Sequence, residues 1–406
     1  MSLVVQKYGG SSVANPERIK KVAQRVSQYC RKGHSLVVVV SALGDTTDEL
    51  LELASSITAN PSRRELDMLL STGEQISVSL LAMALHELKT DAISFTGGQV
   101  GIMTDSSHTR ARILDISTHR IQEELKKKRV VIVAGFQGIN LQREITTLGR
   151  GGSDLTAVAL AKALSADACE IYTDVEGIFT TDPRLTKNAR KIRKISYEEM
   201  LELASSGAQV MQSRSIEVAG KYNIPLHVRS SFSRHEGTWI VKEDKSMEDV
   251  LIRGVSLNKN EAKLTLGGVP NHPGVAALIF RSLANGAINV DMIIQNIGKS
   301  TDTDISFTVP RSEMDNAVDT LQSARKKIGF RAISQDPNIS KVSVVGIGMR
   351  SHAGVAASMF EVLGKSKINI EMISTSEIKI SCIVKKQDGE RAVKLLHDHF
   401  KLGKGK

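Results

Sequence analysis

Short aliphatic runs alternate with helical patterns along the first 230 residues of the chain. This alternation is typical of a sheet with helices packed on both of its faces. The predicted strands, in chain order, are residues 3–7, 36–40, 92–95, 130–134, 169–173 and 226–229. We therefore expect an α/β fold here, a three-layer αβα domain with a mostly parallel sheet.

The first helix is predicted directly after the first strand. Asn15 can cap its start, Pro16 suits its first position, and Gly33 can end it. Apolar residues recur between them at helical spacing, namely Ile19, Val22, Val26 and Tyr29. The chain thus begins with a βα unit.

The polar pattern changes after about residue 231. Residues 242–249 carry seven charged or polar side chains around Met247, as a linker would. The predicted large domain therefore covers residues 1–240, and residues 241–260 form a linker and the start of the next region.

An internal repeat follows this boundary. The sequence HPGVAA at 272–277 returns as HAGVAA 80 residues later, and NVDMII at 289–294 returns as NIEMIS at the same offset. Each copy has the order strand, helix, strand, strand, helix, and in the first copy these elements are predicted at residues 262–266, 275–284, 290–295, 304–309 and 314–327. This order indicates two ferredoxin-like βαββαβ domains, at 261–335 and 340–406, which form a platform without catalytic residues of its own.

Composition agrees with a multidomain globular protein. A chain of 406 residues is too long for one ordinary hydrophobic core, which indicates more than one domain. Hydrophobic residues make up 41% of the chain and charged residues 24%, and this composition excludes collagen-like and disordered proteins. The longest aliphatic run, residues 36–40, is far shorter than the ~20 residues of a membrane-spanning helix. Cys30, Cys169 and Cys382 lack metal-ligand spacing and predict packed free thiols. We expect a cytoplasmic protein with neither signal peptide nor membrane anchor.

The net charge of +10 raises the possibility of nucleic-acid binding. Aromatic residues make up only 4% and do not interleave with the basic runs at 126–129, 325–327 and 401–406. These runs are typical of solvated helix ends and a chain terminus. An anionic small substrate explains the charge more simply, and no nucleic-acid partner is expected.

The turn after the first strand has the sequence KYGGSS. Gly9 and Gly10 allow backbone N–H groups to approach phosphates, and the Lys7 ammonium can meet their charge. The alternative is an ordinary βα turn with a surface lysine. A Walker A loop is excluded, because the Gly-Lys-Ser triplets at 298–300 and 364–366 lack the leading glycine.

The stretch LGRGGSD at 148–154 comes just before a helical pattern. Three glycines within four residues indicate a backbone that bends tightly, at a helix N-terminus where an anion is favoured. Arg150 offers a fork for a carboxylate and Ser153 a hydroxyl. Asp154 can cap the helix, hold a cation, or do both.

Three further polar segments follow predicted strands or begin predicted helices. Residues 173–184 form a turn-rich segment, which could be a nucleotide wall or a loop held by Asx turns. Polar residues at 41–47 follow the second strand. The sequence LLSTGE at 69–74 is predicted to precede a long amphipathic helix, so Glu74 could simply complete a capping pattern.

Together these motifs resemble the aspartokinase family, the aspartate 4-kinases of the amino-acid kinase superfamily, over nearly the whole chain. The matching segments are KYGGSS at 7–12, VVVVSALGDTTDEL at 37–50, LLSTGEQ at 69–75, TLGRGGSD at 147–154, YTDVEGIFTTDPR at 172–184, VRSSFS at 228–233 and STSEIKIS at 374–381. The resemblance identifies the repeats as ACT domains.

The resemblance implies roles for individual residues. Lys7 would stabilise the transferring phosphoryl group, and Asp154 would orient Lys7. Aspartate would be bound by Ser41, Thr47, Glu74, Arg150 and Ser153, with Glu74 meeting its ammonium group and Arg150 a carboxylate. ATP, with Mg²⁺ on its phosphates, would be contacted by Lys7, Tyr8, Gly9, Gly10, Thr173, Asp174, Phe179, Asp182 and Arg184. Gln209 departs from the family, which often has lysine there in contact with the nucleotide.

The implied reaction is ATP plus L-aspartate giving 4-phospho-L-aspartate and ADP, the first step of lysine, threonine and methionine biosynthesis. Two alternatives stay open, namely a kinase for glutamate or acetylglutamate, and a ligand-sensing protein with an inert kinase half. Intact Lys7, Glu74, Arg150 and Asp154 disfavour the second.

Regulation is likewise implied by the resemblance. Lysine, threonine or both would bind where ACT domains pair side by side in a homo-oligomer, and an internal start near Met247 would permit a separate regulatory subunit. The predicted effector residues are His272, Gly274, Val275, Ala276, Ala277, Asn289, Asp291, Met292, Ala353, Gly354, Asn369, Ile370, Thr375 and Ser376.

Overall fold

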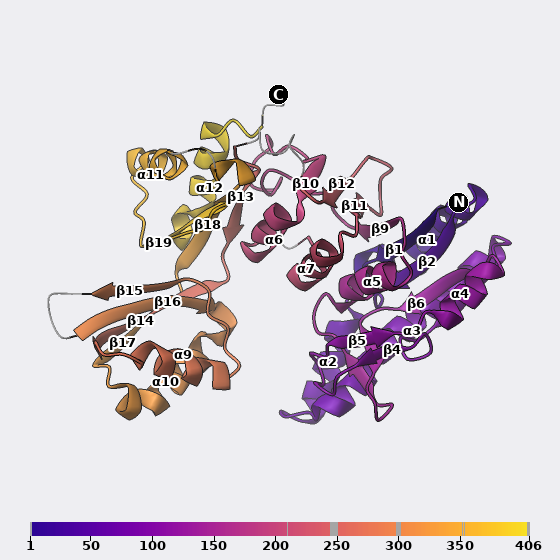
Figure 1. Ribbon diagram of the computed structural model, residues 1–406, viewed down its shortest axis with the longest axis horizontal. Coiled ribbons are helices and arrows are strands. Elements are labelled where there is room, and N and C mark those ends of the chain that lie inside the picture. Colours follow the sequence, from indigo (N-terminus) through magenta and orange to yellow (C-terminus); the bar gives the residue numbers. More distant parts are fainter. Residues whose placement is uncertain are drawn as a thin grey trace. The chain divides into compact units, whose positions relative to one another are not determined.

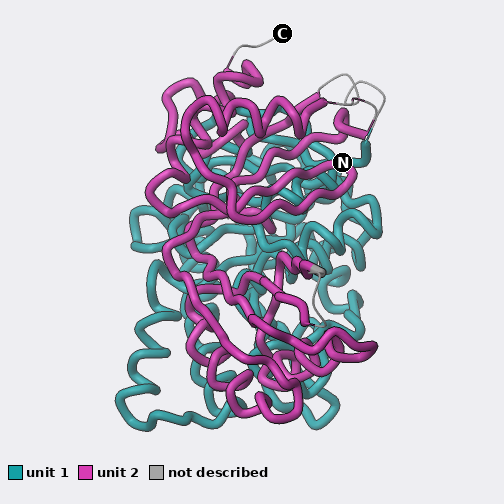
Figure 2. Tube along the Cα trace, turned by 90° about the vertical axis from the view of Figure 1, so that its left-hand side faces the viewer, with its two compact units in different colours: residues 1–178, 191–204, 209–247 teal, residues 179–190, 205–208, 248–406 magenta. Residues whose placement is uncertain are grey.

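The computed structural model describes residues 2–208, 210–243, 251–297, 302–350, 352 and 354–403. The residues outside these ranges include Gln209, residues 244–250 of the predicted linker with Met247, the triplet at 298–300, and Ala353. The chain divides into two compact units (Figure 2). Unit 1 comprises residues 1–178, 191–204 and 209–247, and unit 2 comprises residues 179–190, 205–208 and 248–406.

Unit 1 is built on an eight-stranded sheet with the order β10-β12-β11-β9-β1-β2-β6-β3. All neighbouring strands run parallel except β11 and β12, which pair antiparallel. In sheet order the strands are β10 (Lys194–Ser196), β12 (Thr238–Val241), β11 (Leu226–Ser230), β9 (Ala168–Thr173), β1 (Leu3–Tyr8), β2 (Ser35–Val40), β6 (Val130–Ala134) and β3 (Ala92–Phe95). The six strands predicted from the sequence are all present, and the mostly parallel sheet is confirmed.

Helices cover both faces of this sheet (Figure 1). One face packs against α1 (Pro16–Arg31) and α3 (Arg63–Glu87), and the other against α5 (Gly152–Ala163), which in turn contacts α7 (Ser213–Tyr222). The remaining helices of the unit are η1 (Gly10–Ser12), α2 (Thr46–Ile57), α4 (His119–Lys126) and α6 (Tyr197–Ser205). The layers therefore form the expected αβα sandwich.

The predicted start of α1 is confirmed in detail, whereas the predicted start of α3 is wrong. The Asn15 side chain accepts the N–H of Arg18 at 3.0 Å, and the helix begins at Pro16. The segment at 69–74 lies inside α3 and does not precede it. Gly73 is accommodated mid-helix because α3 packs tightly there, and a Cβ at Gly73 would lie 2.8 Å from Cβ of Ala42.

A small second sheet completes unit 1, with the order β5-β4-β7-β8. Its strands are β5 (Ile113–Ile116), β4 (Ile102–Thr104), β7 (Gln137–Ile139) and β8 (Ile145–Thr147). Strand β8 leads directly into the glycine-rich turn at 148–152, so this sheet supports one wall of the candidate site.

Unit 2 contains two four-stranded antiparallel sheets, each with two helices (Figure 1). The first consists of β14 (Glu261–Pro270), α9 (Val275–Asn285), β15 (Ile293–Ile297), β16 (Asp302–Pro310), η2 (Arg311–Glu313), α10 (Met314–Ile328) and β17 (Ala332–Asp336). The second consists of β13 (Gly254–Asn258), β18 (Ile339–Val345), η3 (Ile347–Arg350), α11 (Val355–Lys365), β19 (Met372–Thr375), β20 (Lys379–Lys385), η4 (Lys386–Asp388) and α12 (Gly389–His399). Both are ferredoxin-like, as expected.

The second ferredoxin-like sheet contains a strand, β13, that precedes the whole first small domain in the sequence. Its order is β13-β18-β20-β19, so β13 occupies the place of a strand that would follow α12. The described residues 400–403 after α12 form a turn, which leaves that sheet position to β13. The first small domain is therefore inserted between β13 and the rest of the second.

Among the described residues, α3 is the one helix whose length and apolar composition would suffice to cross a bilayer. Half of its most apolar window is buried inside the protein. Its inner face packs with Val78, Leu81 and Leu85 in the core of unit 1.

Candidate active site

Lys7 and Asp154 form an ion pair at the centre of unit 1. Gln6 and Tyr8 point to the face of the sheet opposite Lys7, because side chains alternate along a strand. Lys7 Nζ lies 2.7 Å from Asp154 Oδ1, and the two side chains are 13% and 7% exposed. Asp154 Oδ2 accepts the backbone N–H of Gln212 at 3.3 Å. Lys7 is therefore no surface lysine, and the cation held by Asp154 is Lys7.

The glycine-rich turn before α5 explains why Asp154 is not the helix cap. Gly151 occupies the N-cap position with φ of 70°, and Gly149 has φ of 80°. A Cβ at Gly151 would lie 2.7 Å from Cβ of Gln212, and one at Gly152 would lie 2.9 Å from Cβ of Leu148. The turn thus requires glycine for both conformation and packing.

The other glycine turn meets the carboxyl ends of β9, β1 and β2. The Gly9 N–H donates to the Tyr172 carbonyl at 3.2 Å, and the Ser41 N–H donates to the Tyr8 carbonyl at 3.1 Å. A Cβ at Gly10 would lie 2.9 Å from the carbonyl oxygen of Gly44. Ligands of open parallel sheets bind at this edge of the sheet.

Glu74 is buried beside this edge, on the inner face of α3. It is 3% exposed, and its Oε1 accepts the Ala42 N–H at 3.1 Å. Oε2 has no hydrogen-bond partner in the part of the chain that the structure describes. Burial raises the pKa of Glu74 to about 7, although the Ala42 N–H favours the ionised form. A buried carboxylate with an unused oxygen is suited to receive a cationic group.

The remaining candidate aspartate ligands lie on three neighbouring segments. Ser153 is buried in the first turn of α5, and Thr47 lies in the first turn of α2, shortly after Ser41. The Arg150 side chain is 97% exposed and is 3.7 Å from the Asp48 carboxylate. Its positive charge is therefore accessible to an anion.

The predicted ATP contacts divide between the two units. Thr173 and Asp174 follow β9 in unit 1, where the Thr173 hydroxyl donates to Asp174 at 3.0 Å. Phe179, Asp182 and Arg184 belong to unit 2. Asp182 accepts two hydrogen bonds from the Arg184 guanidinium, at 3.0 and 2.7 Å, and these lower the pKa of Asp182.

Two contributors to this region were not singled out from the sequence. Gln212 donates its backbone N–H to Asp154 and its side-chain amide to the Arg150 carbonyl, at 2.6 Å. Asp67, fully buried on α3, accepts hydrogen bonds from the segment beside the glycine-rich turn. Neither has a local motif, although a lone aspartate within the apolar run of α3 is a signal in retrospect.

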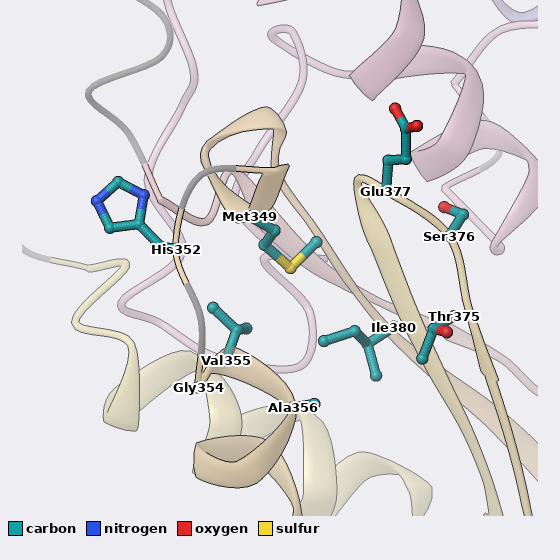
Figure 3. Close-up of a pocket in the computed structure, with 9 residues that line it drawn as sticks. All are labelled: Met349, His352, Gly354, Val355, Ala356, Thr375, Ser376, Glu377 and Ile380. Atoms are coloured by element: carbon teal, nitrogen blue, oxygen red, sulfur yellow. The ribbon is translucent and has the colours of Figure 1, made fainter.

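A pocket of about 200 Å³ lies in the second small domain (Figure 3). The Met349, Val355 and Ile380 side chains are turned toward one another, and Thr375 lies on the facing strand (Figure 3). Of the predicted effector residues, Gly354, Thr375 and Ser376 line it. Asn369 and Ile370 are absent from its described lining, whereas Met349, His352, Val355, Ala356, Glu377 and Ile380 also line it.

The corresponding residues of the first repeat are engaged in packing. Asp291 forms an ion pair with buried Lys341 of the second repeat, and Lys263 pairs in the same way with Glu371. Met292 is buried between the two sheets. In contrast, Gly274 caps α9 with φ of 95° and faces open space. His272, Ala277 and Asn289 are exposed, Val275 is core, and Ala276 is half-buried.

The described residues contain no cluster of three or more His, Cys, Asp or Glu side chains that could hold a metal ion. Magnesium in kinases is bound by one or two carboxylates together with substrate phosphates, so a dedicated cage is not required.

Comparison with known proteins agrees with this geometry. The Amino acid kinase family matches residues 2–230, and the ACT domain family matches residues 265–324 and 342–400. An aspartate kinase of Pseudomonas putida is 53% identical over 403 residues, which cover 99% of this chain and 98% of the relative.

Solved structures give the same assignment. E. coli aspartokinase III in complex with aspartate and ADP (R-state) is 28% identical, with a TM-score of 0.82 over 98% of this chain and 99% of that one. The same enzyme in complex with lysine and aspartate (T-state) is 28% identical, with a TM-score of 0.76 and the same coverage. The chain therefore belongs to the aspartate kinase family, with an amino-acid kinase domain followed by two ACT domains.

Proposed function

We propose that the chain transfers the γ-phosphoryl group of ATP to the side-chain carboxylate of L-aspartate, with Lys7 as the central catalytic residue. The observation that carries this proposal is the Lys7–Asp154 ion pair, which lies between two glycine turns at the carboxyl edge of the sheet. The aspartate side chain has a pKa of about 3.9 and arrives ionised, so no general base is needed. The chemical difficulty is to bring two anions together.

Lys7 addresses this difficulty directly. Its ammonium would neutralise the negative charge that moves between the donor and acceptor oxygens during phosphoryl transfer. The ion pair with Asp154 holds the Lys7 side chain in a fixed position. Backbone N–H groups of Ser153 in the first turn of α5 and of Gly10 would donate to phosphate oxygens. Catalysis then rests on positioning and charge stabilisation.

Aspartate itself would be bound at both ends. The unused Oε2 of buried Glu74 would accept from the substrate ammonium, and Arg150 would bind a carboxylate through its accessible guanidinium. Ser41, Thr47 and Ser153 would supply hydroxyl contacts. This pairing of a buried acid with an exposed base favours a substrate that carries both an ammonium group and a carboxylate.

The nucleotide would be contacted by Lys7, Tyr8, Gly9, Gly10, Thr173, Asp174, Phe179, Asp182 and Arg184. Magnesium would neutralise phosphate charge when bound with ATP, and Asp174 is a candidate carboxylate for it. Tyr8 would act through its backbone, since its side chain is fully buried and stacked on Tyr172 with ring centroids 4.6 Å apart.

We further propose feedback inhibition of this cytoplasmic enzyme by lysine, threonine or both. The pocket at Gly354, Thr375 and Ser376 is the preferred site, because it combines an open helix N-terminus with hydroxyl groups. Side-by-side pairing of ACT domains in a homo-oligomer is supported by two edge strands, β15 and β19, which expose Ile293 and Ile373 at equivalent positions.

One assay tests the catalytic and regulatory parts together. Acyl phosphate is trapped with hydroxylamine in the presence of ATP and aspartate, glutamate or N-acetylglutamate, with and without lysine and threonine. We expect hydroxamate only with aspartate, and less of it when an effector is present. Product with another acid but not with aspartate would contradict the assignment.

A further inference from the structure

Asp67 is a fully buried carboxylate that accepts hydrogen bonds from three residues on two segments, namely His108 and Thr109 on one and Thr147 on the other. It lies on α3, and its relative exposure is 0%. Its Oδ1 accepts the Thr147 hydroxyl at 2.5 Å, and its Oδ2 lies 2.7 Å from Nδ1 of His108. The backbone N–H of Thr109 lies 3.1 Å from both oxygens.

Thr109 has an unusual backbone conformation. Its φ is +68°, in the left-handed region that β-branched residues strongly avoid. Such a conformation persists only where the surroundings impose it, and such positions cluster at functional sites. Here the N–H of Thr109 donates to the Asp67 carboxylate, and we infer that this hydrogen bond stabilises the left-handed conformation.

Thr109 in turn contacts the glycine-rich turn. A Cβ placed on Gly149 would lie 3.3 Å from the Thr109 carbonyl oxygen, so that carbonyl packs directly against the turn. Thr147, the other residue bound by Asp67, ends β8 one residue before the turn begins. The Ala111 N–H also donates to the Thr147 carbonyl at 2.9 Å, which fixes the segment to β8.

Asp67 also fixes the helix that carries Glu74. The two residues are seven positions apart on the buried face of α3, or about 10 Å along the helix axis. Between them, the Ser71 carbonyl accepts the Gln137 side-chain amide at 2.9 Å. Asp67 therefore links the Glu74 side of the site to the turn that carries Arg150 and Ser153.

We propose that Asp67 is a positioning residue for aspartate binding, which holds Thr109 in its left-handed conformation against Gly149 and so sets the distance between Glu74 and Arg150. Asp67 does not touch the substrate in this account. The proposal rests on the aspartate-binding roles given above to Glu74 and Arg150.

The test compares steady-state kinetics of Asp67→Ala and Asp67→Asn in the full chain. We expect Asp67→Ala to raise KM for aspartate at least tenfold, while KM for ATP stays within twofold. Asp67→Asn keeps a carbonyl acceptor for Thr109 or Thr147 and should raise KM for aspartate less. Glu65→Gln, on the exposed face of the same helix, is the matched control and should leave both constants unchanged.

Thr109→Gly separates positioning from stability. Glycine adopts the left-handed conformation freely and retains the N–H donor, so Tm should rise and KM for aspartate should stay within twofold. If Asp67→Ala fails to fold, Asp67→Asn and Thr147→Val, which deletes one donor to Asp67, must still raise KM for aspartate alone.

The proposal is overturned if folded Asp67 variants keep KM for aspartate within twofold, or raise both KM values equally. Arg150→Ala in the same assay distinguishes two failures. If Arg150→Ala leaves KM for aspartate unchanged, the proposed aspartate site is wrong. If Arg150→Ala raises it and the Asp67 variants do not, only the positioning role is wrong.

Discussion

Glu74 and Glu170 are both buried carboxylates, and their surroundings move their pKa values in opposite directions. Burial dominates at Glu74 and raises its pKa to about 7. Burial also opposes ionisation of Glu170, but hydrogen bonding with His227, the Arg229 charge and further donors lower its pKa to about 2. Glu74 is thus suited to bind a cation from outside the protein. Glu170 already forms an ion pair, because its Oε1 lies 3.1 Å from Nη1 of Arg229.

The raised pKa of Glu74 predicts a pH dependence of aspartate binding. Below pH 7 Glu74 is protonated in the free enzyme, so KM for aspartate should rise as pH falls through 7, while KM for ATP changes little. Glu74→Gln should raise KM for aspartate and abolish this step. A wild-type KM for aspartate that is flat from pH 6 to 8 would contradict the role of Glu74.

The same shift has a consequence for stability. A carboxyl group whose folded pKa is raised from about 4.5 to about 7 destabilises the folded state increasingly between these pH values, by about 3 kcal/mol above pH 7. Glu74→Gln should therefore unfold at a higher Tm than the wild type at pH 8, and this gain should shrink toward pH 5.

Glu170 should have the opposite effect on stability and stabilise the folded state when it is ionised. It accepts from Gln6 at 2.8 Å and Tyr29 at 2.9 Å, and it joins β1, β9, β11 and α1 on the face of the sheet away from Lys7. Its stabilising effect is present above its unfolded pKa of about 4.3 and is lost as pH falls toward 2.

We expect Glu170→Gln to lower the free energy of unfolding at pH 7 by about 3 kcal/mol, because Arg229 loses its buried partner. Urea unfolding can be followed by the fluorescence of Trp239, the single tryptophan, which stacks on His227 with ring centroids 4.0 Å apart. The difference from wild type should shrink as pH falls below 4. Equal stability of both proteins at pH 7 would contradict the role given to this network.

At the scale of elements, periodicity and caps predicted helix α1 and six of the eight strands of the large sheet, but not β10 and β12. They failed at α3, because Leu69–Glu74 resembles a helix start and Gly73 is unusual in a helix interior. Only the close packing on Ala42 explains that glycine. Strand β13 was missed because its partner, β18, begins at Ile339, far along the chain from the end of β13 at Asn258. Lys7 and Asp154 were found through family motifs, whereas Asp67 has no motif and needed the fold.

Strand β13 predicts where the regulatory region can be cut. A fragment of residues 247–406 retains β13, whose Val255 is 1% exposed, and should unfold cooperatively on heating. A fragment of residues 260–406 lacks that strand and exposes the apolar edge of β18. We expect it to lose cooperative unfolding of the second small domain, as measured by circular dichroism. Equal melting curves for the two fragments would show that β13 is dispensable.

At the scale of the whole molecule, unit 2 contains more than the two ACT domains. The segment 179–190 packs within it, where the Thr180 hydroxyl lies 2.9 Å from Nε2 of buried His397 and Leu185 joins the apolar core of the second small domain. This segment also carries Asp182 and Arg184, so two of the proposed nucleotide contacts lie in the same structural unit as the proposed effector pocket. We expect an effector bound at that pocket to alter ATP binding through this segment.

The most direct test of this account is the kcat of Lys7→Ala with ATP and aspartate both saturating. We expect a loss of about a thousandfold or more, because the Lys7 charge acts chiefly where negative charge moves in the transition state. The variant should retain wild-type circular dichroism, and its KM for aspartate should change less than that of Arg150→Ala. A kcat within twofold of the wild type would show that Lys7 does not stabilise phosphoryl transfer, and the account would be contradicted.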